Sequence, residues 1–264
     1  MSEQPGFGSA TIGHAHFPPN SRHPMSLRFE ELAWQETPLG EVSLRRRHDP
    51  ALDVDIYEVK LGDEFLMSSL FPVAEIELAH LGLAAVKGDA LNVVVGGLGL
   101  GYTAEAVLTH KRVAVMTVVD ALDAVIDWHQ RELLPVSTPI VTDARTRLVH
   151  DDFFDLMRRP PASDSLFDAI LVDIDHSPRH LLNENSAGFY TVEGIRQAAA
   201  HLKHGGAFAL WSDDPPDDAY SAVLGEVFDT VEAHVVPFAN PLTGGTSANT
   251  VYVASGVDCS QAAE

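Results

Sequence analysis

The chain has 264 residues, 45% of them hydrophobic, and can bury a substantial core in one large domain, or in one large and one small domain. Its formal charge of −21, from 38 acidic against 17 basic residues, produces a field that repels phosphate backbones, so we expect no nucleic acid partner. No run approaches the roughly 18 apolar residues of a membrane span, no leader peptide is recognisable, and the single Cys259 cannot form a disulfide framework; we expect a cytoplasmic protein with no membrane partner.

The first part of the chain divides into two segments. Residues 1–24 are rich in Gly, Pro and Ser and show no apolar periodicity, which predicts a flexible arm; its histidines His14, His16 and His23 lack carboxylate or cysteine partners, so we expect no metal site. Over 25–72, alternating stretches such as "EVSLRRRH" and "VDIYEVKL" are separated by turn signals. This pattern predicts a small antiparallel β domain.

The remaining chain, 73–256 followed by a tail over 257–264, alternates buried strands with helices after a helix in "FPVAEIELAHLGLAAVKGDA". We expect an α/β, doubly wound, Rossmann-like domain with a seven-stranded sheet, in which ligands bind beyond the carboxyl ends of the strands. The expected strands are 91–96, 113–119, 146–150, 168–173, 206–212, 229–237 and 249–254, and the expected helices are 102–109, 122–134, 186–203 and 217–226.

Four glycines follow the first of these strands in "NVVVGGLGLGYTAEAVLTH": Gly96, Gly97, Gly99 and Gly101. Glycine permits a tight turn and lets a ligand touch backbone amides at a helix N-terminus, so the loop indicates a nucleoside-bearing cofactor. Such turns also occur only to let a strand and a helix pack closely. The spacing fits both the G-x-G-x-x-G/A form of dinucleotide sites ("GLGYTA") and the G-x-G-x-G form of S-adenosylmethionine enzymes ("GLGLG").

Acids at the next two strand ends favour the second form. Asp120, followed by Ala121, comes 19 residues after Gly101, where a carboxylate accepts hydrogen bonds from ribose hydroxyls; a solvated helix cap is the alternative. Asp152 and Phe153 follow the third strand, where an acid suits the adenine amino group and an apolar neighbour suits its face. A dinucleotide site has no particular use for that pair, so we expect adenosine.

These motifs, in the order "NVVVGGLGLG", "VVDALDAVI", "DARTRLVHDDFFDLM", "FDAILVDIDHSP" and "GFYTVEGIRQAAAHLKHGGAFALW", resemble the spermidine synthase family within the class I methyltransferase-like superfamily. The resemblance covers roughly residues 37–254. It implies a homodimer, with Asp120 on the ribose, Asp152 on the adenine amino group, and Asp173 at the position of the family's catalytic aspartate.

Three departures fall on the amine side of the site. Gly99 stands where the family's G-G-G-D-G-G loop has the aspartate that meets the amine of decarboxylated S-adenosylmethionine. The family's Tyr-His-Glu corresponds to Ala74-Glu75-Ile76, which predicts that a phenol and a carboxylate are lost, and its D-x-x-D-P becomes "DIDHSP". The adenosine side, in contrast, is intact.

Asp173, Asp175 and His176 follow the fourth strand and are our candidate catalytic residues, because a carboxylate or imidazole there could take a proton from an attacking nucleophile. A carboxylate that ends the buried run "AILV" is costly without a task or a partner, which favours a function for Asp173. Asp175 and His176 could equally shape the loop before Pro178. Trp211, Asp213 and Asp214 reach the same edge, where they suit core packing and a solvated helix entry as well as a substrate wall.

The sequence therefore predicts an S-adenosylmethionine-dependent transferase with a small-molecule acceptor, and methyl transfer is its main interpretation. Gly99 would leave open backbone amides for the carboxylate of the intact donor. Aminopropyl transfer from decarboxylated S-adenosylmethionine is the alternative, favoured by the net charge of −21, and a non-catalytic nucleoside-binding scaffold is the second alternative.

Overall fold

The structure is a computed structural model that describes residues 29–162 and 165–257. The predicted arm over 1–24, its histidines, and the tail beyond 257 with Cys259 lie outside the described residues. The N-terminal part forms a four-stranded antiparallel sheet, ordered β1-β2-β3-β4, as the alternating pattern predicts. Its strands are β1 (Phe29–Thr37), β2 (Gly40–Asp49), β3 (Val54–Leu61) and β4 (Glu64–Ser68).

The predicted seven-stranded α/β sheet is confirmed, in the order β10-β11-β9-β8-β5-β6-β7. The pairs β5–β6, β5–β8, β6–β7 and β8–β9 are parallel, whereas β11 is antiparallel to both β9 and β10. Its strands are β5 (Leu91–Gly96), β6 (Val113–Asp120), β7 (Thr146–His150), β8 (Phe167–Val172), β9 (Leu202–Ser212), β10 (Phe228–Asn240) and β11 (Gly245–Val257).

Helices cover both faces of this sheet, and β5 shows why its run of valines is continuous. Val93 and Val95 pack into a core beneath α1 and α2, whereas Val94 points to the opposite core, which includes residues of α5, α6 and α7. Each strand residue is thus buried on one face or the other. The helices are α1 (Val73–Ala84), α2 (Tyr102–Thr109), α3 (Asp123–Gln130), α4 (Ser137–Thr142), α5 (Phe153–Arg158), the 3₁₀ helix η1 (Glu184–Tyr190), α6 (Val192–Ala200) and α7 (Asp218–Gly225).

Several predicted boundaries need correction. The helix expected over 122–134 ends at Gln130, and α4 and α5 are additional. The helix expected over 186–203 breaks at Thr191, whose extended backbone and side-chain hydroxyl cap α6 by accepting from the Gly194 N–H, and β9 begins at Leu202. Among the described residues no helix has the length and apolar character to cross a membrane.

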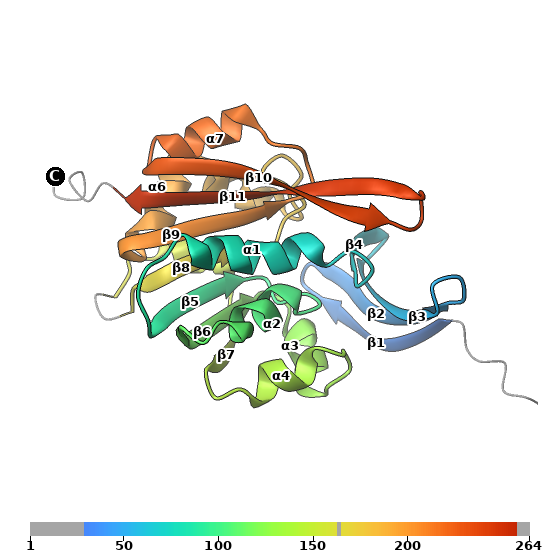
Figure 1. Cartoon of the computed structure of the whole chain (residues 1–264). Helices are drawn as coiled ribbons and strands as arrows, with labels where there is room; N and C mark the ends of the chain where they lie inside the picture. The colour runs from blue at the N-terminus through green and yellow to red at the C-terminus, as the bar shows by residue number, and fades with distance from the viewer. Residues whose placement is uncertain (1–28, 163–164, 258–264) are drawn as a thin grey trace, which may run out of the picture.

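The largest deviation is at the end of the sheet, where β10 and β11 are longer than the expected 229–237 and 249–254. Beyond the sheet these two strands continue as a hairpin toward the side where β4 and the N-terminal sheet lie (Figure 1). The hairpin contributes Phe238 and Asn249 to the same cavity as Phe65 of β4, so the C-terminal hairpin and the N-terminal sheet share this cavity.

Candidate active site

The glycine loop between β5 and α2 is shaped mainly by contacts within the protein. Gly97, Gly99 and Gly101 have φ values of +89°, +46° and +92°, a region that favours glycine. A Cβ on Gly97 would lie 2.0 Å from the Asp173 carbonyl oxygen, and one on Gly96 would lie 2.7 Å from the Phe153 ring. Close packing of strand, helix and neighbouring loop therefore already explains these glycines.

The backbone amides of this loop are engaged by Asp120. Its Oδ2 accepts from the Leu98 N–H at 2.8 Å, the Gly99 N–H also donates to the carboxylate, and its Oδ1 accepts from the Leu122 N–H at 2.8 Å. Burial raises the pKa of Asp120, and these hydrogen bonds oppose that shift. The expectation that Gly99 leaves an open backbone for a donor carboxylate is therefore wrong.

A cavity of about 490 Å³ lies beyond the carboxyl ends of β5, β6, β7 and β8, a size that suits a nucleoside. We call it the donor cavity. It brings together the residues predicted for adenosine: Asp120, Ala121, Asp152 and Phe153 all line it. Asp152 also caps α5 by accepting from the Asp155 N–H at 3.0 Å. Further lining residues include Leu39, Leu61, Leu66, Met67, Gly97, Gly99, Leu122, Val125, His150, Asp173, Ile174 and Asp175.

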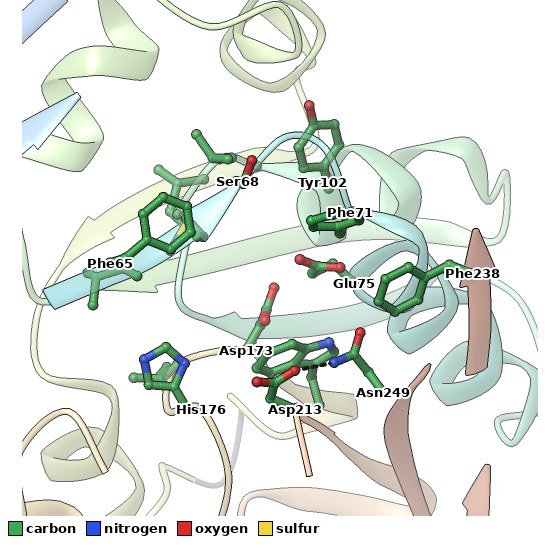
Figure 2. A pocket seen from close by; sticks show the side chains of 18 residues that line it. Phe65, Ser68, Phe71, Glu75, Tyr102, Asp173, His176, Asp213, Phe238 and Asn249 are labelled. Atoms are coloured by element: carbon green, nitrogen blue, oxygen red, sulfur yellow. Dashed lines mark hydrogen bonds between the residues drawn. The ribbon is translucent and has the colours of Figure 1, made fainter. Parts of the chain in front are cut away.

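A second cavity, of about 280 Å³, adjoins the first, and we call it the acceptor cavity (Figure 2). The two share Leu66, Met67, Gly99, Asp173 and Ile174. Its other walls come from β4 and the loop after it, α1, the glycine loop, the start of α2, the loops after β8 and β9, the end of β9, and the β10–β11 hairpin. They comprise Phe65, Ser68, Phe71, Glu75, Leu98, Leu100, Gly101, Tyr102, His176, Trp211, Asp213, Phe238 and Asn249.

Three carboxylates face each other in the acceptor cavity: Glu75, Asp173 and Asp213. Burial and the charges of Asp173 and Asp213 raise the pKa of Glu75 to about 8, and Oε2 of Glu75 is buried with no hydrogen-bond partner among the residues that the structure describes. Burial also raises the pKa of Asp173 to about 6, although the Thr103 hydroxyl donates to its Oδ2 at 2.7 Å. The described residues lining either cavity include no Lys or Arg, and their basic side chains are the histidines His176 and His150.

The other two candidate catalytic residues lie differently. Asp175 is buried, and both of its oxygens are occupied: Oδ1 accepts from the Leu182 N–H at 2.7 Å and Oδ2 from the Tyr190 hydroxyl at 2.6 Å. This placement favours the loop-shaping alternative for Asp175. His176 lines the acceptor cavity, with Nε2 at 3.4 Å from Glu64 Oε1, so it remains a candidate for contact with a substrate.

Sequence reasoning missed much of the acceptor cavity. Ile76 stands at the position of the family's carboxylate, but the neighbouring Glu75 points into the cavity, so the helix before β5 still supplies a carboxylate there. Phe71 and Phe238 meet there, with ring centroids 5.5 Å apart. Their separation in sequence gave no signal for this contact, whereas Glu75, in the first turn of α1, was visible in the segment Ala74-Glu75-Ile76.

A comparison with protein families matches residues 72–222 to the spermine/spermidine synthase domain. The chain belongs to this family. The matched segment runs from the start of α1 into α7 and includes the glycine loop, Asp120, Asp152 and Asp173. It leaves out the N-terminal sheet and the β10–β11 hairpin, which supply part of the acceptor cavity. Comparison with curated proteins finds no match.

Solved structures of spermidine synthases share the fold. One is the spermidine synthase from Thermotoga maritima, with a TM-score of 0.67 and 18% identity over 86% of this chain and 74% of that one. Another is a spermidine synthase in complex with the transition state analogue AdoDATO, with a TM-score of 0.66 and 18% identity over 86% of this chain and 73% of that one. At this level of identity the comparison establishes the architecture, in agreement with the predicted fold.

Proposed function

We propose that the protein transfers an aminopropyl group from decarboxylated S-adenosylmethionine to an amine. The observation that carries this proposal is the junction of the two cavities at Asp173, where a nucleoside-sized cavity opens beside one lined by three carboxylates. Membership of the spermine/spermidine synthase family supports the same chemistry. So does the spermidine synthase of similar fold that was solved in complex with the transition state analogue AdoDATO.

The charges of the walls favour the decarboxylated donor over the intact one. An intact donor carries a carboxylate, which would need a cation or free backbone amides. The described walls contain no Lys or Arg, and Asp120 occupies the amides of Leu98 and Gly99. The ammonium of the decarboxylated donor, in contrast, suits walls that carry carboxylates and no Lys or Arg. For this reason methyl transfer from intact S-adenosylmethionine, the main expectation from sequence, is not carried forward.

Different residues bind the donor and activate the acceptor. Asp120 accepts hydrogen bonds from the ribose hydroxyls, using the carboxylate lone pairs that the loop amides do not occupy. Asp152 and Phe153 hold the adenine. Asp173 takes a proton from the acceptor ammonium, for which a pKa of about 6 is better suited than that of an ordinary aspartate. The freed nitrogen lone pair then forms a bond to the donor's propyl carbon, the carbon–sulfur bond breaks, and its electron pair stays on sulfur. The products are methylthioadenosine and a secondary ammonium.

The test is to incubate the protein with either donor and a mixture of primary amines, and to follow the nucleoside product by mass spectrometry. We expect methylthioadenosine from the decarboxylated donor and no S-adenosylhomocysteine from the intact one. Calorimetric titration should give at least about tenfold tighter binding of the decarboxylated donor. Tighter binding of the intact donor, with S-adenosylhomocysteine as product, would establish methyl transfer instead. Absence of binding by both donors would favour the scaffold.

A further inference from the structure

Within residues 29–162 and 165–257, two buried polar atoms in the walls of the acceptor cavity have no hydrogen-bond partner: Oε2 of Glu75 and Nε1 of Trp211. Buried polar groups are nearly always satisfied, so such atoms in a cavity wall point to a ligand. The carboxylate oxygen calls for a donor and the indole N–H calls for an acceptor. An ammonium offers only donors, so one ammonium can satisfy Glu75, but a second ammonium cannot satisfy Trp211.

The charges in the acceptor cavity also favour an acceptor with a single ammonium. Its described walls carry three carboxylates, Glu75, Asp173 and Asp213, and no Lys or Arg. The raised pKa of Glu75, about 8, leaves this group mostly protonated at neutral pH, so Asp173 and Asp213 are the charged acids that match the sulfonium and the ammonium of the decarboxylated donor. One ammonium on the acceptor can pair with Glu75 by releasing this proton, whereas the second ammonium of a diamine would have no partner and would be costly to desolvate.

The rest of the wall is apolar. Phe71 and Phe238 lie in contact on the side of Glu75 away from His176, and Phe65 adds a third ring (Figure 2). Leu66, Met67 and Ile174 continue this surface toward the donor cavity. Such walls suit an alkyl or aryl group, and any charge that entered there would lose its hydration.

We propose that the acceptor carries a single ammonium and that its remaining part is uncharged, which excludes simple diamines as the preferred acceptors. This inference rests on the proposed aminopropyl transfer and restricts its preferred acceptors to monoamines. Oε2 of Glu75 and the side chain of Asp173 receive the ammonium, the aromatic rings cover the rest of the acceptor, and an oxygen on that part could accept from Trp211.

The test compares three amines of equal length, pentylamine, 4-amino-1-butanol and 1,4-diaminobutane, which differ only in the terminal methyl, hydroxyl or ammonium group. Their binding is measured by calorimetry to the full chain saturated with an unreactive analogue of the decarboxylated donor in which a protonated nitrogen replaces the sulfonium, so that both donor charges are present. Their turnover is measured with the decarboxylated donor itself. We expect the better monoamine to bind at least about tenfold more tightly than the diamine. Equal or tighter binding of the diamine, or no binding of any amine, would overturn the inference.

A charge-matched pair of variants on β10 adds a second test. Phe238→Glu places a carboxylate in the aromatic wall and should shift the preference toward the diamine by at least about tenfold. Val235→Glu makes the same charge change at an exposed position of the same strand that does not line either cavity, and should leave the preference unchanged. An equal shift in both variants would attribute the effect to net charge and remove the support from the aromatic wall.

The two readouts separate this inference from the function on which it rests. Monoamine binding without turnover would support the ligand class and remove aminopropyl transfer. Turnover that prefers the diamine would keep aminopropyl transfer and remove the single-ammonium acceptor.

Discussion

The donor and acceptor cavities share Asp173 and differ in how their acids are held. In the donor cavity, Asp120 and Asp152 already accept hydrogen bonds from backbone amides of the loops around them. In the acceptor cavity, Glu75 has a buried oxygen without a partner and a raised pKa. The donor cavity is thus organised before any ligand binds, whereas the acceptor cavity becomes electrostatically complete only when a cation enters it.

The largest effect should come from the residue at the junction. Asp173→Asn removes the proposed base but keeps an oxygen that can accept from Thr103, so we expect the transfer rate to fall by roughly 10²- to 10⁴-fold while methylthioadenosine binds nearly as before. Rates of nucleoside release and calorimetry measure the two quantities. Asp175→Asn, two residues away, is the control. It should lower the free energy of unfolding by about 1–3 kcal/mol because hydrogen bonds from Leu182 and Tyr190 are weakened or lost, and it should slow the transfer step less than Asp173→Asn does. An equal loss of donor binding and of rate in Asp173→Asn would make Asp173 a donor-binding group.

The donor cavity alone should respond to Asp120→Ala. The variant removes the proposed ribose contacts and leaves the N–H groups of Leu98 and Gly99 without their acceptor, so methylthioadenosine should bind roughly ten- to a hundredfold more weakly, or about 1.5–3 kcal/mol. Calorimetry with the nucleoside, and separately with an amine, measures the effect on each cavity. If amine binding weakens as much as nucleoside binding, the two cavities are not independent.

Titration of Glu75 should make protein stability and amine binding in the acceptor cavity depend on pH. Because its pKa is raised from 4.5 to about 8, the folded protein holds this proton more tightly than the unfolded chain does; this contribution to stability is fully present below pH 4.5 and is lost as the pH rises through about 8. Binding of an ammonium follows the opposite trend, since it favours the carboxylate, and should strengthen by up to about tenfold per pH unit between pH 6 and 8.

Glu75→Gln should flatten both profiles, which denaturant unfolding and amine titration at several pH values would measure. Nucleoside binding at the same pH values serves as the control and should change little. A pH profile for amine binding that survives unchanged in Glu75→Gln would assign the titration to another group.

The smallest effect is expected at Asp152, where structural and binding roles overlap. Asp152→Ala removes the cap of α5 and should cost about 1 kcal/mol of stability, together with the proposed contact to the adenine amino group. Asp152→Ser separates the roles, because serine can cap the helix but presents no carboxylate to adenine. We expect Asp152→Ser to regain stability without regaining nucleoside affinity. Full recovery of both would leave Asp152 as a cap alone.

The α/β sheet and most of the donor cavity could be predicted from the amino-acid sequence. Continuous apolar strands such as β5 could be identified from hydrophobicity alone, and parallel strands bring their carboxyl ends to one edge, so Asp120, Asp152 and Asp173 could be placed together from their positions after strands. The homodimer, the cytoplasmic location and the residue roles remain predictions. Helix ends such as Gln130 and the break at Thr191 were misplaced because local capping competes with apolar periodicity there.

The acceptor cavity, and the reason for the glycines in the loop between β5 and α2, could be recognised only from the packing of the folded chain. Phe65, Glu75 and Phe238 come from a β4 strand, a helix and a late hairpin, and their meeting depends on contacts between elements that no local pattern encodes. The glycine loop looked open to a ligand because sequence does not reveal the partners of backbone amides. Asp120, about 20 residues further along the chain, occupies those amides, and Asp173 and Phe153 fill the space that a Cβ would need.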